Sequence, residues 1–240
     1  MNHGNPSDAS FRLLYRIGAI AAFVFLLFTL VPLVLMIVQP LPPYGGGAAL
    51  LEFIAAHPLL YVAELVCFTG LSIPAMVFFL ALGVALWPSG KDLALLGSVL
   101  GIGSEIAALA FASSPPSLNG GLLGLSAQYM AANEGLRPSI AAAAAALQAF
   151  ANGFTLIGVL TALGIFIVSI PMRRSSFPGW VSILGLITGG SGMILEATRD
   201  LVGPLYALYG ILLLVWPAGI GYGLLRLSTS GIDNVIEKGQ

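Results

Sequence analysis

Long apolar runs, separated by short polar connections, dominate this sequence. The runs cover about residues 14–38, 59–87, 93–112, 139–170, 180–197 and 202–225. A helix rises about 1.5 Å per residue, so a run of about 20 residues crosses the hydrocarbon core of a bilayer. We therefore predict an all-α membrane protein with six transmembrane helices.

The composition agrees with this class and excludes several others. Of the 240 residues, 58% are hydrophobic and only 8% are charged, against about 45–50% and about 25% in soluble domains. The formal net charge of -1, with basic residues scattered along the chain, provides no surface for a nucleic acid. The single cysteine, Cys67, excludes an intrachain disulfide and a multi-cysteine metal site. We predict no metal, no cofactor, and membrane lipids as the partners of the surface.

The connections are too short to hold a soluble domain. We predict a polar leader over residues 1–11, a single transmembrane domain over 12–228 and a polar tail over 229–240. The longest connection, 113–138, carries Leu122 and Tyr129 on one helical face together with Leu125. This spacing predicts one interfacial helix between the third and fourth spans.

Two further features divide the first half of the chain. Residues 48–57 follow a loop rich in proline and glycine, and their weak amphipathicity predicts a short helix at the membrane interface. The second apolar run, 59–87, is longer than a span needs. Pro74 lies inside this run, and we predict a kink there because proline breaks the hydrogen-bond ladder of a helix.

The basic residues predict the orientation in the membrane. Seven of the nine lie on one side of the six predicted spans, which are Arg12, Arg16, Lys91, Arg173, Arg174, Arg226 and Lys238, and two, Arg137 and Arg199, lie on the other. By the positive-inside rule, the side with seven faces the cytoplasm. We predict a multi-pass protein of the cell inner (plasma) membrane with both termini in the cytoplasm.

Glycines mark the helix faces that other helices approach. Gly97, Gly101 and Glu105 follow each other at intervals of four residues, so the three share one face of the third span. The same GxxxG spacing occurs at Gly185 and Gly189, and at Gly219 and Gly223. Small residues at this spacing allow two helix backbones to come close, which predicts that Glu105 lies inside the bundle.

Six polar side chains in or beside the apolar runs are the candidate site residues. They are Glu64, Glu105, Gln148, Asn152, Glu196 and Arg199. With the orientation above, all lie near the middle or in the outer half of the spans. Gln148 and Asn152 share a helical face, and Glu196 continues the face of Gly185 and Gly189. We predict that these groups line a polar pocket that opens outward.

The pocket predicts a binding or transport function. An ionisable group inside an apolar span costs several kcal/mol unless it finds a partner, a proton or water, so such groups mark functional sites. We expect the pocket to bind or transport a small molecule or lipid, with proton coupling through its carboxyl groups. One alternative is an integral-membrane enzyme that uses Glu105 and Glu64 as acid and base on an isoprenoid or lipid. Another is an accessory subunit whose polar residues only connect helices.

The second half of the chain resembles a known family. The resemblance rests on Ile170-Pro171-Met172-Arg173-Arg174, on the stretch Phe177-Pro178-Gly179-Trp180-Val181-Ser182-Ile183-Leu184-Gly185-Leu186-Ile187, and on Leu224-Leu225-Arg226. In layout, these segments are similar to a large bacterial family of six-helix membrane proteins that is classed as a domain of unknown function. The resemblance implies a six-helix fold and implies no activity.

Overall fold

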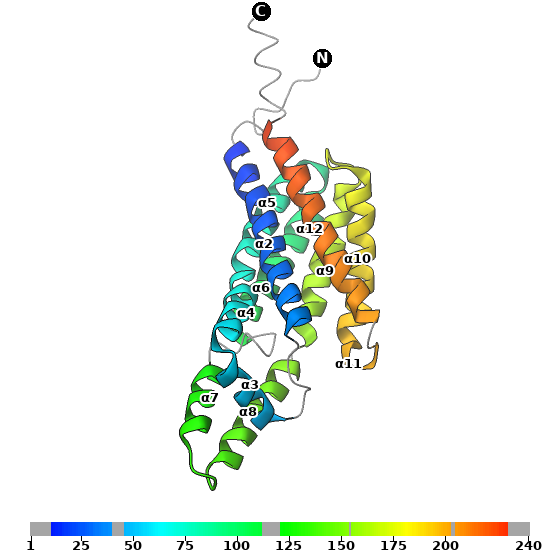
Figure 1. Ribbon diagram of the computed structural model, residues 1–240. Coiled ribbons are helices and arrows are strands. Elements are labelled where there is room, and N and C mark those ends of the chain that lie inside the picture. The colour runs from blue at the N-terminus through cyan, green and yellow to red at the C-terminus, as the bar shows by residue number, and fades with distance from the viewer. Residues whose placement is uncertain (1–10, 40–45, 112–120, 154, 203–204, 230–240) are drawn as a thin grey trace, which may run out of the picture. The chain divides into compact units, whose positions relative to one another are not determined.

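The computed structural model describes residues 11–39, 46–111, 121–153, 155–202 and 205–229. Over these residues the chain is 91% helical and contains no strand (Figure 1). The prediction of an all-α fold is confirmed. The predicted leader and tail fall almost wholly outside the described residues.

The helices follow one another with short connections. Their bounds are α2 Arg12–Val38, α3 Gly47–Ala56, α4 Pro58–Gly70, α5 Ser72–Leu86, α6 Lys91–Phe111, α7 Gly121–Ala131, α8 Arg137–Gly153, α9 Thr155–Met172, α10 Gly179–Ala197, α11 Arg199–Val202 and α12 Leu205–Thr229, with a 3-10 turn, η1, at Trp87–Ser89. Local sequence explains where α4 begins and why α8 is helical. Pro58 opens α4, where its missing N–H would have had no helical partner. The run of alanines in α8 consists of the residue type with the highest helix propensity.

Within the described residues, five helical segments are long and apolar enough to cross a membrane. They are Arg12–Leu35, Pro58–Ser89, Lys91–Ala110, Gly179–Ala197 and Leu208–Thr229, and they coincide with the first, second, third, fifth and sixth predicted runs. The predicted fourth run falls on two helices, α8 and α9, on either side of residue 154. Of these, Leu156–Met172 forms a shorter apolar helix. The five segments indicate a membrane-spanning protein.

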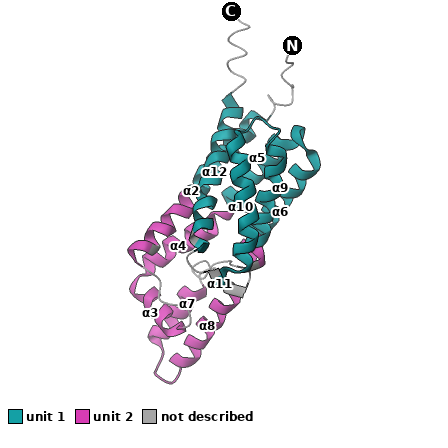
Figure 2. Ribbon diagram, turned by 90° about the vertical axis from the view of Figure 1, so that its right-hand side faces the viewer, with its two compact units in different colours: residues 1–26, 73–105, 158–240 teal, residues 27–72, 106–157 magenta. Residues whose placement is uncertain are grey.

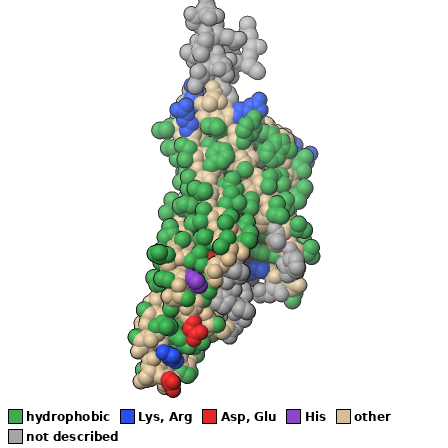
Figure 3. All heavy atoms as spheres, in the orientation of Figure 1, with side chains coloured by type: hydrophobic (Ala, Val, Ile, Leu, Met, Phe, Trp, Pro, Cys, Tyr) green, Lys and Arg blue, Asp and Glu red, His purple; other side chains and the backbone are tan. Residues whose placement is uncertain are grey.

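The outer surface of α2 has the composition expected for contact with lipid. Leu13, Ile20, Leu27 and Val34 recur every seven residues and are 69%, 62%, 55% and 54% exposed. Residues at this interval lie on the same side of a helix. Hydrophobic side chains cover most of the face that Figure 3 shows over α2 and α12. A continuous apolar surface of this kind suits a hydrocarbon environment better than water.

The second predicted span is interrupted close to its predicted kink. Helix α4 ends at Gly70, Leu71 forms a turn, and α5 begins at Ser72. Pro74 follows in the first turn of α5. A proline ring clashes with the carbonyl group four residues before it, which here belongs to Gly70. The interruption therefore lies one turn before the proline that causes it.

The chain forms two compact units, each assembled from segments that are distant in sequence (Figure 2). Unit 1 comprises residues 1–26, 73–105 and 158–240, and unit 2 comprises residues 27–72 and 106–157. The unit boundaries fall inside α2, α6 and α9 and next to the turn between α4 and α5. The single transmembrane domain predicted over 12–228 stays a prediction.

Unit 1 is built around aromatic side chains and close helix crossings. Trp216 of α12 is fully buried, and its ring contacts Phe78 and Phe79 of α5 at centroid distances of 6.1 and 6.2 Å. Helices α6 and α9 cross where Gly164 meets the backbone of Gly97 and Gly101. The prediction that this glycine face of the third span is approached by another helix is confirmed.

In unit 2, α3 packs against both α7 and α8. Leu51 and Ile54 of α3 are completely buried with Leu122 of α7 and Ala144 of α8. The Ser126 hydroxyl of α7 donates a 2.6 Å hydrogen bond to the Leu51 carbonyl oxygen. Short helices are thus confirmed at both sites where the sequence predicts interfacial helices, residues 48–57 and the segment around 122–129.

The crossing of α6 and α9 gives a testable prediction. A Cβ atom at Gly164 would lie 2.9 Å from the Gly101 nitrogen, whereas a Cβ atom at Gly103 would meet no heavy atom within 4 Å. We expect Gly164→Val to destabilise the protein by about 1–3 kcal/mol, the usual cost of overpacking, and Gly103→Val to be nearly neutral. Thermal unfolding in detergent measures both. Equal stability of the two variants would contradict the crossing.

Candidate functional site

Glu196 closes a stripe of small residues on the buried face of α10. Gly185, Gly189, Gly192 and Glu196 are all buried, while Ile183, Ile187 and Ile194 on the other faces are more than half exposed. The facing predicted for the fifth span is therefore confirmed. A Cβ atom at Gly158 of α9 would lie 2.8 Å from the Glu196 Cγ atom. The absence of a side chain at Gly158 thus leaves the space that the glutamate occupies.

One hydrogen bond and one nearby positive charge stabilise the Glu196 carboxylate. The Tyr206 hydroxyl donates a hydrogen bond to Glu196 Oε1 at 2.9 Å. The Arg199 guanidinium attracts the same carboxylate and donates to the Tyr206 hydroxyl oxygen. Hydrogen bonds to charged groups stabilise by about 1.5–3 kcal/mol, more than bonds between neutral groups. Glu196, Arg199 and Tyr206 therefore form one connected polar group at the α10, α11 and α12 junction.

Glu105 joins this group through Tyr209. Glu105 of α6 is 6% exposed, as is Glu196, and both carboxylates interact electrostatically with Tyr209 of α12. The Tyr209 ring is nearly fully buried against Gly192 and meets the Tyr206 ring edge-on at 5.9 Å. We call these residues the acidic cluster: Glu105, Glu196, Arg199, Tyr206 and Tyr209.

Hydrogen bonds beside Glu105 fix the helix that carries it. The Thr161 hydroxyl of α9 donates to the Ser104 hydroxyl oxygen at 2.9 Å, and Ser104 in turn donates to the Gly101 carbonyl oxygen at 2.7 Å. The bond from Thr161 holds α6 against α9 one residue before the carboxylate, and the bond to Gly101 fixes the Ser104 side chain within α6. The position of Glu105 is therefore set by both glycine contacts and side-chain bonds.

The acidic cluster contains half of the predicted site residues. Glu105, Glu196 and Arg199 come together in unit 1, whereas Glu64, Gln148 and Asn152 belong to unit 2. Sequence reasoning missed Tyr206 and Tyr209. Their signal was available, because two tyrosines three residues apart at the start of the last apolar run share one face of a helix.

Two of the predicted site residues in unit 2 are buried. Glu64 of α4 is completely buried, and Gln148 of α8 is 7% exposed. Burial of Gln148 agrees with the predicted inward face of α8. The side chain of Asn152 lies outside the described residues.

Unit 2 also contains a group of interacting polar side chains that lies outside the predicted spans. The Tyr129 hydroxyl of α7 donates to Glu52 Oε1 of α3 at 3.2 Å, and the Arg137 guanidinium lies 5.5 Å from the centre of the Tyr129 ring. Burial raises the pKa of Tyr129, and the hydrogen bond to the Glu52 carboxylate raises it further. Tyr129 therefore stays neutral and acts as a donor that ties α7 to α3.

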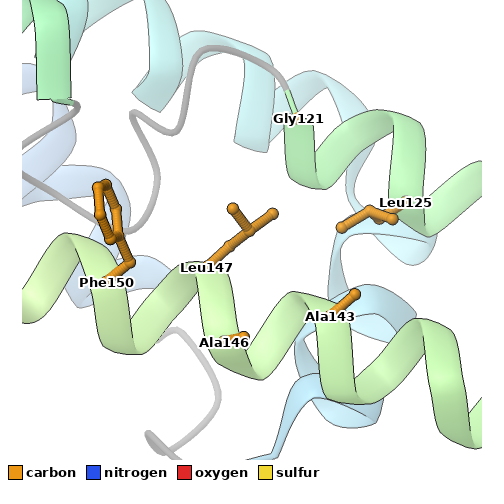
Figure 4. Close-up of a pocket in the computed structure, with 6 residues that line it drawn as sticks. All are labelled: Gly121, Leu125, Ala143, Ala146, Leu147 and Phe150. Carbon is orange, nitrogen blue, oxygen red and sulfur yellow. The ribbon is translucent and has the colours of Figure 1, made fainter.

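An apolar groove lies between α7 and α8. It measures about 630 Å³ and is lined by Gly121, Leu125, Ala143, Ala146, Leu147 and Phe150. Figure 4 shows Leu125 and Leu147 directed into the space between the two helices. The lining carries no charged or hydrogen-bonding side chain, so the groove can take an apolar chain and offers no group for catalysis.

The histidine, cysteine and carboxylate side chains of the described residues do not form a metal site. Within the described residues, no three histidine, cysteine, aspartate or glutamate side chains come together in a group that could hold a metal. The acidic cluster contains two carboxylates, but an arginine accompanies them. Its chemistry is that of hydrogen bonding and proton exchange.

Comparison with known proteins does not assign this chain to a family. No family model matches this chain, and no curated protein or solved structure matches it either. The resemblance to the six-helix bacterial family stays a prediction.

The bond between Glu196 and Tyr206 can be measured by a double-mutant cycle. We expect Glu196→Ala and Tyr206→Phe to be coupled by about 1.5–3 kcal/mol in unfolding free energy, because the bond has a charged acceptor and neither variant can form it. Tyr222 of the same helix is 54% exposed, so Tyr222→Phe is the matched control and should show coupling near zero with Glu196→Ala. Additive effects of the first pair would exclude the bond.

Proposed function

We propose that this protein is a multi-pass protein of the cell inner membrane that binds a small molecule or lipid at the acidic cluster and exchanges protons there. Six spans with both termini in the cytoplasm complete the proposal. The distribution of basic residues supports this orientation, with seven on the cytoplasmic side and two on the other. In that orientation the acidic cluster lies in the outer half of the membrane.

The observation that carries the proposal is that two buried carboxylates from different helices interact electrostatically with the same buried tyrosine. Glu105 and Glu196 come from different helices, and both act on Tyr209. Two carboxylates and one guanidinium leave the cluster with one excess negative charge when all are ionised. Inside an apolar span such a charge is costly. A proton, or a ligand with a positive or hydrogen-bond-donating group, removes that cost.

The apolar groove of unit 2 supports a lipid-like ligand as a second feature. Its volume of about 630 Å³ falls within the range of about 300–1,000 Å³ usual for small-molecule pockets. An open apolar groove of this size can take the apolar chain of a lipid. The groove and the acidic cluster belong to different units, and each supports the proposal separately.

The alternatives make different use of the same residues. An acid–base enzyme acting on an isoprenoid or lipid requires Glu105 and Glu64 as an acid and base pair. An accessory subunit requires every carboxylate to be paired within the protein. Glu196 meets that requirement through Tyr206, whereas the Glu64 oxygens accept no hydrogen bond within the described structure. Binding therefore accounts for more of the polar residues than packing does.

The proposal predicts a molecule that is retained by the cluster. The protein is extracted with its surrounding lipid, and its bound molecules are identified by mass spectrometry for the wild type, Glu105→Gln and Glu196→Gln. We expect retention of one molecule to fall about ten-fold or more in both variants, since a lost bond to a charged group costs at least about 1.5 kcal/mol. Glu134→Gln, on an exposed turn, is the control and should retain it.

Retention should also depend on pH in the wild type, and Glu105→Gln should flatten that dependence. Two findings would refute the proposal. One is a wild type that carries the same molecules in the same amounts as the double variant Glu105→Gln/Glu196→Gln. The other is an unchanged pH profile in Glu105→Gln.

A further inference from the structure

A buried carboxyl group in unit 2 has no hydrogen-bond partner among the described residues. Glu64 of α4 is 0% exposed, and neither of its oxygens makes a hydrogen bond in the described structure. A carboxylate can accept about four hydrogen bonds, so its whole capacity is unused. Leaving such a group ionised and alone in an apolar interior costs several kcal/mol.

The neighbouring tyrosine is unpaired in the same way. Tyr61 is also 0% exposed, and its hydroxyl has no hydrogen-bond partner in the part of the chain that the structure describes. Tyr61 and Glu64 are three residues apart on α4, so their side chains are neighbours on one helix face. Two unsatisfied oxygen groups side by side are rare in protein interiors. Thr69 also has an unpaired hydroxyl, but its position five residues after Glu64 turns it toward another face.

We propose that Tyr61 and Glu64 form a binding site for a single positive charge. The site offers one negative charge and up to three oxygen atoms, which are the ligands that hard cations and ammonium groups prefer. A monovalent ion or an ammonium group balances the charge of one carboxylate. A divalent ion would leave an excess positive charge, since the described residues contain no further group of acidic or histidine ligands.

The Tyr61 and Glu64 site differs from the acidic cluster because the described residues supply no positive charge and no hydrogen-bond donor to Glu64. In the acidic cluster, Arg199 supplies a positive charge and Tyr206 a hydrogen bond to Glu196. Among the described residues, Glu64 is given neither kind of partner, and the proposed cation supplies the positive charge. Glu64 lies six residues after Pro58, where α4 begins, which is about 9 Å along the helix. In the proposed orientation, this end of α4 faces the outer side, so the cation enters from there.

The test compares cations at constant ionic strength. The purified full-length protein, in an uncharged detergent at pH 8, is heated in choline chloride, sodium chloride, potassium chloride or ethanolamine hydrochloride. Choline is too bulky for a buried carboxylate and serves as the reference. We expect the unfolding temperature to rise with the logarithm of the concentration of the bound cation, because a ligand of the native state stabilises it by mass action. A rise with sodium or potassium identifies a metal ion, and a rise with ethanolamine alone identifies an ammonium group.

The variants separate this site from the acidic cluster. Glu64→Gln should abolish the cation-dependent rise, and Tyr61→Phe should shift it to higher concentrations. Glu134→Gln and Glu196→Gln should keep it. Loss of the rise in Glu196→Gln with retention in Glu64→Gln would place the cation in the acidic cluster and overturn the inference. The retention experiment on Glu105 and Glu196 can fail without affecting this result.

A direct measurement guards against variants that do not fold. The wild type is labelled with ¹³C in its glutamate carboxyl groups, and infrared difference spectra are recorded between choline and the stabilising cation. We expect an ionised carboxylate band to appear and a protonated carboxyl band to disappear on cation binding. An unfolding temperature that is the same in all four salts, or a carboxyl spectrum unchanged by the cation, overturns the inference. Glu64 is then a neutral carboxylic acid and no more.

Discussion

A carboxylate on a helix surrounded by hydrocarbon requires a partner within reach, and this requirement organises the polar chemistry of the protein. Each unsatisfied charge costs several kcal/mol in such an environment, so the helices that carry Glu105 and Glu196 must present them to other helices. Glycine makes this possible, because two helix backbones can touch only where side chains are missing. At Gly158 the missing side chain is replaced by the Glu196 carboxyl group itself. The contact between Glu196 and Gly158 therefore packs α10 closely against α9 and at the same time buries the carboxyl group.

The faces of individual helices could be predicted from the sequence. The spacing of Gly97, Gly101 and Glu105 on α6, and of Gly185, Gly189 and Glu196 on α10, predicts the buried side of each helix, and the structure confirms both. The reason is physical. In an apolar helix the position of a lone charged or glycine residue is constrained far more than that of any leucine, since leucine is stable against either lipid or protein.

Contacts between distant segments could not be predicted in the same way. The pairing of Glu196 with Tyr206, and the use of Tyr209 by two carboxylates, depend on how α10 and α12 are placed by packing. Tyrosine is common at membrane interfaces, so its role is ambiguous in sequence. The contact between α8 and α3 was also missed. The alanine run that begins α8 is apolar by composition, yet in the structure it packs against the short helix α3.

The central claim is that Glu196 is held by Tyr206 inside the helical core. Solid-state NMR on protein in phospholipid bilayers tests it without any substitution, using ¹³C labels at the glutamate carboxyl carbons and at the tyrosine Cζ atoms. The 2.9 Å hydrogen bond predicts a strong cross peak between the Glu196 carboxyl carbon and Tyr206 Cζ. A spectrum in which Tyr206 shows no cross peak to any glutamate carboxyl carbon would contradict the account.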